Sequence, residues 1–266
     1  MTGSGNNTYL LAGTVDTPDS GRHVHSHDRT AALVDSGVGA PEHLGALRSA
    51  LAAHRARLTL VLVTHGHRDH AAGAPAIAAA HPDATFAKYP WSGEDVDDGL
   101  AWQALRDGEQ VVAGGEPLTV LHTPGHSPDH LTFWHDASGS AFTGDLVVLG
   151  SSVMIHTSGG GNLAQYLATL ERLINLKPSQ LLPAHGPRID DPRAVLTGYL
   201  EHRRARERQV IAALRAGRDT VQAIAESIYD GLDPALVPAA RENVLAHLEK
   251  LEAEGRAVNE SGRWGV

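Results

Sequence analysis

Up to about residue 195, short apolar runs alternate with amphipathic segments. Residues 58–63 form a continuous apolar run, which is typical of a strand buried on both faces. Apolar positions at helical spacing predict helices over residues 41–53, 73–80 and 163–174, with Asn162 as a candidate N-cap of the last. Further apolar runs predict strands at residues 9–12, 30–35, 85–87, 118–122, 131–134, 141–143 and 180–182. This alternation of strands and helices indicates an α/β domain.

The pattern changes near residue 195, after which helix signals dominate. Three helices and a hairpin are predicted, at residues 199–214, from 219 onward, at 238–254, and at 256–258 paired with 263–265. The second helix is expected to start at Asp219, with Gln222 three residues later as in a capping box. Gly255 is expected to end the third helix. We therefore predict two domains, 1–195 and 196–266, of which the second is winged-helix-like.

The densest group of chemically active side chains follows the predicted strand 58–63. Three imidazoles and one carboxylate lie within six residues, at His65, His67, Asp69 and His70. The carboxyl end of a strand is where α/β proteins bind ligands. Because His65 and His67 can point to one side of a turn while Asp69 and His70 begin the next segment, the spacing favours two adjacent metal ions over one. A polar surface loop is the alternative interpretation.

Three further candidates follow other predicted strands. His126 comes after residues 118–122, Asp145 after 141–143, and His185 after 180–182. Each is flanked by Gly or Pro, which allows tight turns that aim a side chain at a shared point. Any one of them alone is more often a structural turn residue. Their joint occurrence, each after a strand, is what indicates a metal site.

With these residues in place, the sequence resembles the metallo-β-lactamase superfamily, in particular its hydrolytic branch with ligands like those of glyoxalase II. The resemblance covers nearly the whole chain and implies a four-layered αβ/βα sandwich. It implies that His65, His67 and His126 bind one metal, that Asp69, His70 and His185 bind the other, and that Asp145 bridges the two. Two such metals can share a hydroxide, lower its pKa and polarise the electrophile. Asp69 could also orient that hydroxide and is the candidate catalytic residue.

The metal itself is expected to be a divalent ion, with Zn²⁺ favoured and Mn or Fe possible. Asp69 stands where the flavodiiron branch typically carries Glu, so the motif is more similar to the zinc hydrolases. The chain has no cysteine, which excludes a thiolate site and disulfides and leaves His, Asp and Glu as ligands. Its 17 histidines agree with such a site but do not establish it.

The C-terminal region resembles the winged-helix tail of lactamase-β-like proteins, some of which are endoribonucleases acting on single-stranded RNA. The charges argue against RNA binding here. From residue 196 onward there are 10 Lys and Arg against 11 Asp and Glu, and the whole chain carries a net charge of −9. Nucleic-acid binding depends on a surplus of Lys and Arg. We interpret the local basic patch, which comprises Arg203, Arg204, Arg206 and Arg208, as a solvated helix face or a dimer contact.

Several weaker features complete the sequence analysis. The stretch His23-Val24-His25-Ser26-His27-Asp28 resembles a metal clip but is better interpreted as an exposed hairpin tip. Residues 158–161 are expected to form a flexible loop. Ser151, Ser152 and His156 are expected near the mouth of the site, either contacting substrate or only filling the loop. The sequence shows no signal peptide and no transmembrane run, so a cytoplasmic protein without membrane contact is expected.

Three functions remain as hypotheses. The favoured one is a binuclear metal-dependent hydrolase acting on a small-molecule ester, thioester or lactone. The alternative enzyme is a metal-dependent endoribonuclease acting on single-stranded RNA. The third hypothesis is a non-catalytic protein with structural metals, which the open type of ligand set disfavours. No Gly-x-Ser-x-Gly elbow, Walker motif or dinucleotide fingerprint is present. A homo-oligomer through the C-terminal domain is compatible with all three hypotheses.

Overall fold

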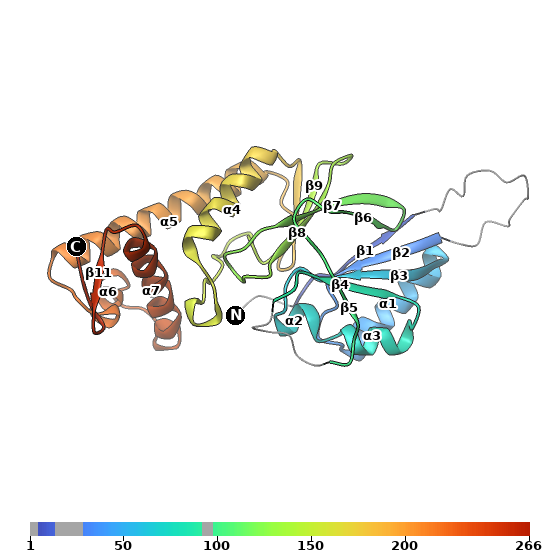
Figure 1. Cartoon of the computed structure of the whole chain (residues 1–266), viewed down its shortest axis with the longest axis horizontal. Helices are drawn as coiled ribbons and strands as arrows, with labels where there is room; N and C mark the ends of the chain where they lie inside the picture. Colours follow the sequence, from blue (N-terminus) through green and yellow to red (C-terminus); the bar gives the residue numbers. More distant parts are fainter. Residues whose placement is uncertain (1–4, 14–28, 92–97) are drawn as a thin grey trace, which may run out of the picture. The chain divides into compact units, whose positions relative to one another are not determined.

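The computed structural model describes residues 5–13, 29–91 and 98–266 (Figure 1). The described residues divide into two compact units. The first contains residues from 1–123, 129–148 and 178–190, and the second contains 124–128, 149–177 and 191–266. The predicted boundary between residues 195 and 196 lies inside a continuous helix, α5 (Pro192–Arg215), and stays a prediction. The stretch from His23 to Asp28 lies outside the described residues.

The first unit contains two five-stranded sheets. The first sheet has the order β1-β2-β3-β4-β5, from β1 (Tyr9–Ala12), β2 (Arg29–Val34), β3 (Ala56–Leu62), β4 (Thr85–Lys88) and β5 (Trp102–Ala104). Apart from β1, which pairs antiparallel with β2, its strands are parallel. The second sheet has the order β10-β9-β8-β7-β6, from β6 (Gln110–Ala113), β7 (Glu116–His122), β8 (Leu131–His135), β9 (Ser140–Gly144) and β10 (Gln180–Pro183). In it, β9 and β10 pair parallel.

The alternation of side chains along β2 shows how the first unit is layered. Ala32 and Val34 contribute to a core shared with strands of the second sheet, such as Phe133 of β8. Ala31 and Leu33 point to the opposite face and pack in a second core with residues of the helices. Those helices are α1 (Pro41–His54) and α3 (Ala74–Ala80), and a single turn of helix, α2 (Arg68–Ala71), precedes α3. The two sheets therefore face each other, and helices cover the outer face of the first.

The second unit is mostly helical. It contains η1 (Thr157–Gly159), α4 (Leu163–Leu176), α5, α6 (Val221–Ile228), η2 (Pro234–Leu236) and α7 (Val237–Ala253), followed by the hairpin β11 (Val258–Glu260) and β12 (Arg263–Gly265). Side chains cap the starts of its helices: Asn162 accepts a hydrogen bond from the backbone N–H of Gln165, and Asp191 accepts one from that of Ala194. The N-cap predicted at Asn162 is confirmed.

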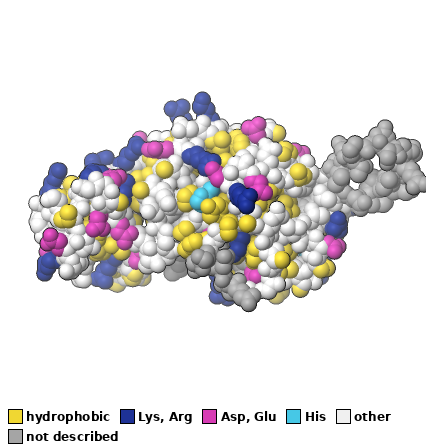
Figure 2. Space-filling view, in the orientation of Figure 1, with side chains coloured by type: hydrophobic (Ala, Val, Ile, Leu, Met, Phe, Trp, Pro, Cys, Tyr) yellow, Lys and Arg dark blue, Asp and Glu magenta, His cyan; other side chains and the backbone are white. Residues whose placement is uncertain are grey.

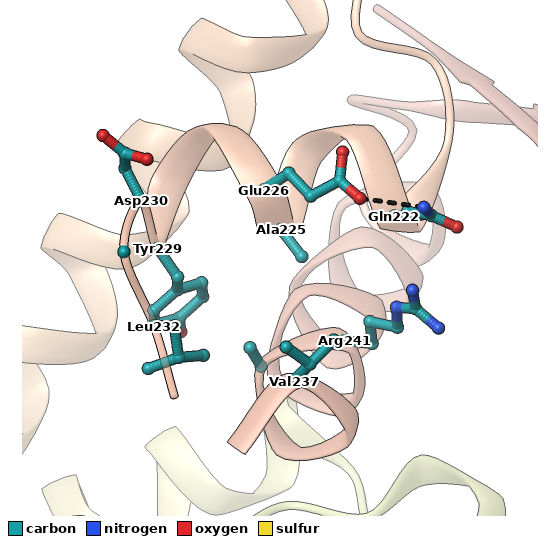
Figure 3. A pocket seen from close by; sticks show the side chains of 10 residues that line it. Gln222, Ala225, Glu226, Tyr229, Asp230, Leu232, Val237 and Arg241 are labelled. Carbon is teal, nitrogen blue, oxygen red and sulfur yellow. Dashed lines mark hydrogen bonds between the residues drawn. The ribbon is translucent and has the colours of Figure 1, made fainter. Parts of the chain in front are cut away.

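The C-terminal helices and hairpin form the predicted winged-helix arrangement around their own core. Val210 of α5, Ile224 of α6, Val244 of α7 and Trp264 of β12 are all buried in it. A cavity of about 230 Å³ lies between α6 and the start of α7, and its lining includes Glu226, Asp230, Tyr229 and Arg241 (Figure 3). The expected α/β sandwich with a winged-helix-like tail is therefore confirmed.

The structure corrects three details of the sequence analysis. Thr220, not Asp219, caps α6, because its hydroxyl accepts from the N–H of Ala223. Asp219 instead pairs with Arg263, and its carbonyl accepts from the N–H of Trp264. Residues 157–159 form a turn of 3-10 helix within the segment expected to be a flexible loop. Strands β5 and β6 and the single turn α2 were not predicted. No helix among the described residues has both the length and the apolar character to cross a membrane.

Candidate metal centre

The predicted ligands lie where strands of the first unit end. His65 and His67 occupy the turn after β3, and Asp69 and His70 belong to the short helix α2 that follows it. Asp145 directly follows β9, and His185 lies two residues beyond β10. Because β9 and β10 run parallel, Asp145 and His185 leave the second sheet at the same edge. His126 lies in the short connection between β7 and β8.

These side chains form three overlapping groups whose candidate ligand atoms lie within 4.8 Å of one another. The groups are His65, His67 and His126; His65, His70 and Asp145; and Asp69, His70 and His185. All seven residues predicted from the sequence occur in at least one group. The middle group shares His65 with the first group and His70 with the third. The first and third groups are therefore neighbours, and the arrangement can hold two adjacent cations. The role of each residue as a ligand stays a prediction.

The hydrogen bonds of three imidazoles indicate which ring nitrogen faces the centre. His70 Nδ1 lies 2.8 Å from the Asp35 carboxylate, His185 Nδ1 lies 3.0 Å from the Gly5 carbonyl, and His126 Nδ1 lies 2.9 Å from the Met154 carbonyl. Carbonyls and carboxylates accept hydrogen bonds, so each Nδ1 must donate. In the neutral ring the lone pair is then on Nε2, which is the tautomer that a metal ligand needs.

The Nε2 atoms of His70 and His185 are buried and have no hydrogen bond of normal geometry. Their nearest charged neighbours are carboxylate oxygens, with Asp145 at 3.6 Å from His70 and at 3.2 Å from His185, and Asp69 at 3.7 and 3.3 Å. Buried polar atoms are normally satisfied, so these two call for a partner. Imidazole nitrogens and carboxylate oxygens facing a common point fit a divalent metal ion.

The carboxylates make this centre strongly anionic. Burial lowers the pKa of His70, but the charges of Asp35 and Asp145 outweigh it and raise the pKa to about 10. Contacts with Asp145 and Asp69 raise the pKa of His185 to about 10. The pKa of Asp69 is lowered, chiefly by its contact with His185. The same carboxylates attract a divalent cation, which would bind in exchange for the Nε2 proton of each imidazole.

Asp35, which sequence reasoning missed, supports the centre from the end of β2. Its side chain is 2% exposed, and its backbone adopts a left-handed conformation with a φ of 62°. One carboxylate oxygen accepts from the N–H of Thr64 at 2.8 Å, and the other binds His70 Nδ1. Such a carboxylate behind a histidine fixes the ring and raises its basicity. The only sequence signal was an acidic residue at the end of a predicted buried strand.

His130 and Asp129, which directly precede β8, were also missed. His130 is fully buried, and its Nε2 accepts a hydrogen bond from the backbone N–H of Asp145 at 3.1 Å. Asp129 accepts from the N–H of Gly66 at 2.7 Å, within the His65 to His70 turn. Both residues hold the backbone that carries predicted ligands. Their proximity to His126 in the sequence was the signal that could have found them.

The three residues expected near the mouth of the site lie in the second unit. Ser151, Ser152 and His156 are all exposed. The carbonyl of Ser151 accepts a hydrogen bond from the hydroxyl of Tyr199 at 2.8 Å. Whether these side chains contact a substrate stays a prediction.

Two family models match the chain. The model described as "Metallo-beta-lactamase superfamily" matches residues 24–185, which is more than half of the chain and includes all seven predicted ligands. The model described as "Beta-lactamase associated winged helix domain" matches residues 220–264. The match to the second model agrees with the three helices and hairpin described above.

Curated relatives align over most of the chain. A "Beta-lactamase-like protein 2 homolog" of Drosophila melanogaster is 29% identical over 268 residues, covering 96% of this chain and 85% of the relative. The "Lactamase-like protein adaB" of Aspergillus niger is 32% identical over 245 residues, covering 86% and 74%. An "Atrochrysone carboxyl ACP thioesterase" of a Cryptosporiopsis species is 31% identical over 193 residues, covering 73% and 57%.

Solved structures of other proteins share this fold. A metallo-β-lactamase family protein of Thermus thermophilus superposes with a TM-score of 0.72 at 22% identity, covering 97% of this chain and 98% of that one. This likeness shows the fold alone. A second protein, TTHA1623 solved in a di-iron-bound form, superposes with a TM-score of 0.55 at 27% identity, covering 74% and 92%.

Proposed function

The chain belongs to the metallo-β-lactamase superfamily, and on that premise we propose that it is a binuclear metal-dependent hydrolase acting on a small-molecule ester or thioester. The observation that carries the proposal is that the seven imidazole and carboxylate side chains predicted as ligands lie together in overlapping groups. The relatives named as thioesterases support the class of substrate. A lactone, which is a cyclic ester, belongs to the same chemical class.

We assign the seven residues to two ligand sets, one for each ion. His65, His67 and His126 would hold one ion, Asp69, His70 and His185 the other, and Asp145 both. Bound divalent metals supply a nucleophile from water at neutral pH and polarise the carbonyl of the substrate. Asp69, whose side chain is 41% exposed, is the accessible carboxylate of the set and would accept a proton or orient water. Zn²⁺ is the proposed metal, and the di-iron form of one structural relative makes iron the first alternative to test.

RNA cleavage is the second candidate, because the chain carries the winged-helix tail from whose resemblance this alternative was drawn. The basic patch on α5 does not support it. Arg203 is 1% exposed, Arg204 pairs with Glu171 at 2.9 Å, and Arg206 lies over the ring of Tyr229 at 4.2 Å. The interpretation of the patch as a solvated helix face is therefore wrong for Arg203, which no phosphate can reach. Arg204 and Arg208 are exposed, but Arg204 already faces a carboxylate, so the patch gives RNA binding little support.

Among the described residues, the face of the molecule drawn in Figure 2 shows no large basic patch of the kind that RNA binding needs. On the face in Figure 2, the dark-blue Lys and Arg side chains are interspersed with magenta Asp and Glu side chains. The cavity between α6 and α7 has Glu226 and Asp230 in its lining beside Arg241. Carboxylates at this position repel a polyanion, so the cavity does not favour RNA either.

The test is a hydrolysis screen with purified full-length protein, loaded with Zn²⁺ or with Fe²⁺ and compared with a chelated sample. The panel contains acyl thioesters, aryl esters, lactones and a single-stranded RNA. We expect hydrolysis of a thioester or ester that the chelator abolishes. His67→Ala should lower kcat/KM by about 10²-fold or more, which corresponds to about 2.7 kcal/mol or more. Arg204→Met, which removes an exposed charge outside the ligand set, is the matched control and should retain full activity.

Two outcomes would contradict the proposal. Cleavage of RNA without turnover of any ester or thioester would favour the nuclease. Wild-type activity in the chelated sample, or in His67→Ala, would mean that the ligand set does not carry the reaction.

A further inference from the structure

In the second unit, three backbone carbonyls of the segment 151–154 accept hydrogen bonds from side chains. The carbonyl of Ser151 accepts from the Tyr199 hydroxyl at 2.8 Å, and the carbonyl of Val153 accepts from the Arg203 guanidinium. The next carbonyl, that of Met154, accepts from His126 Nδ1 at 2.9 Å. Tyr199 and Arg203 are one helical turn apart on α5. The segment thus lies between side chains of α5 on one side and the ring of His126 on the other.

Arg203 is an unusual residue to find in such a place. Its side chain is 1% exposed and is the largest of the fully buried side chains. Its charge is met by the Val153 carbonyl and by the face of the Tyr166 ring, 5.5 Å from the guanidinium carbon. Burying a guanidinium is costly, and an aliphatic side chain would fill the volume without that cost. The burial of Arg203 is therefore better explained by its hydrogen bond to the Val153 carbonyl than by packing alone.

A second contact leads from Arg203 to the same loop. Tyr166 lies on α4, which packs against α5 within the second unit (Figure 1). The backbone of Tyr166 comes so close to Gly125 that a Cβ on Gly125 would stand 2.4 Å from the Tyr166 nitrogen. Gly125 has a φ of 137°, and its carbonyl accepts from the N–H of Asn162 at 2.8 Å. Helix α4 therefore holds the residue just before His126, and Tyr166 of the same helix places its ring over the Arg203 guanidinium.

We propose that Arg203, with Tyr199, is a positioning residue that orients His126 for metal binding through the peptide groups of residues 151–154. Fixing the Val153 carbonyl fixes the Met154 Cα, because both belong to one planar peptide group. Only the two backbone dihedrals of Met154 then remain to place its carbonyl, and the hydrogen bond to His126 Nδ1 sets them. The Met154 carbonyl holds the proton on Nδ1 and directs Nε2 towards a metal. The C-terminal helix α5 thereby sets the geometry of one ligand. This inference rests on the proposed function in that it takes His126 as a ligand.

The experiment measures metal binding directly. Full-length Arg203→Met, Arg203→Lys and Tyr199→Phe are titrated with Zn²⁺ against a chromophoric chelator, and their Co²⁺ forms are compared by visible absorption. Outer groups behind a metal ligand typically change affinity by about 10- to 100-fold, and we expect about tenfold in Arg203→Met for one of the two metals. The other metal should keep its affinity, and the Co²⁺ spectrum should change. Arg203→Lys, which keeps a donor, should recover most of the loss, and Tyr199→Phe should show a smaller loss.

Two controls separate positioning from stability. Arg204→Met removes the neighbouring, exposed charge, and Val210→Ala opens a cavity in the C-terminal core on the same helix. Both should keep wild-type metal affinity and spectrum, although Val210→Ala lowers the melting temperature. Equal weakening of both metals in Arg203→Met, or wild-type affinity with only a lower melting temperature, would overturn the proposal. If neither Arg203 variant folds, wild-type affinity in Tyr199→Phe would overturn it.

The same titrations test the underlying function separately. His126→Ala should lose one metal and keep the other. If the wild type binds no metal, or if His126→Ala binds both as the wild type does, the proposed function fails whatever the Arg203 variants show. If His126→Ala loses one metal while Arg203→Met keeps both, only the positioning role fails.

Discussion

At the scale of single residues, the centre depends on carboxylates behind the predicted ligands as well as on the ligands themselves. Asp35 is the clearest case, because its two oxygens bind two different elements. One accepts from the N–H of Thr64, just after β3, and the other binds Nδ1 of His70 on α2. Its left-handed backbone is a conformation that non-glycine residues adopt only at a cost. The buried hydrogen bonds of its carboxylate offset the cost of this backbone conformation.

We predict that Asp35→Asn weakens metal binding by about 10- to 100-fold. The amide keeps the shape of the side chain but removes the negative charge that stabilises His70 when a metal draws on its lone pair. Chelator-competition titrations with Zn²⁺ measure the change. Asp83→Asn is the matched control, since Asp83 is an exposed acid whose partner Arg57 is 3.8 Å away. Unchanged affinity in Asp35→Asn would show that this carboxylate only supports the turn.

The sequence revealed the ligands and not their supports for a physical reason. His65, His67, Asp69 and His70 lie within one turn, so their cooperation is visible in a short window. Asp35 and His70 are 35 positions apart, and Asp129 and Gly66 are 63 apart. Contacts at that separation follow from strand order, which apolar patterns do not specify. His130 was overlooked for another reason: a histidine beside a ligand motif has no feature that marks it as buried.

At the scale of elements, strongly apolar runs were predicted well and half-exposed ones were not. Strand β3 overlaps most of the run 58–63, so the strand predicted there is confirmed. Strand β5 has three residues, two of them exposed, and β6 exposes Val112, so neither shows a clear apolar run. The start of α6 was placed one residue early because Asp and Thr are both good caps. Only the structure shows that the Asp219 carboxylate pairs with Arg263 of the hairpin and so does not cap the helix.

An ion-pair network joins α5, α7 and the residues that follow α7. Glu207 lies 2.6 Å from Lys250 and 2.8 Å from Arg256. Burial raises the pKa of Glu207, but the hydrogen bonds and charges of Lys250 and Arg256 outweigh it and lower the pKa below its ordinary value. A carboxyl whose folded pKa is lowered contributes stability above the ordinary pKa of about 4.3, and loses it as the pH falls through the folded pKa.

We therefore predict that Glu207→Gln costs about 1 kcal/mol of unfolding free energy at pH 7, a value that allows for screening by solvent. The difference from wild type should shrink below about pH 4.3, because protonated Glu and Gln are then equivalent. Urea unfolding at several pH values measures this dependence. Glu252→Gln, at an exposed position of α7, is the control and should show no such loss. A difference that is constant with pH would mean that packing, not charge, is lost.

At the scale of the whole molecule, the proposed metals link folding to the chemistry of the site. In the metal-free chain, the Nε2 atoms of His70 and His185 are buried without good hydrogen bonds, close to the carboxylates of Asp69 and Asp145. A ligand that binds the folded state but not the unfolded state raises stability by mass action. The fold and the proposed activity therefore share one thermodynamic cycle.

We predict that Zn²⁺ at a free concentration about 1,000 times its Kd stabilises the chain by about 4 kcal/mol for each ion bound. A stability gain of 1 kcal/mol raises the melting temperature of a chain of this size by roughly 2–4 °C, so chelation should lower it by at least several degrees. Calorimetry with buffered Zn²⁺ and with chelator measures the difference. Val210→Ala, which weakens the C-terminal core, should lower both melting temperatures and keep the difference between them. His67→Ala should reduce that difference instead. A melting temperature that is the same with Zn²⁺ and with chelator would contradict the proposal that the ligand set binds the ion.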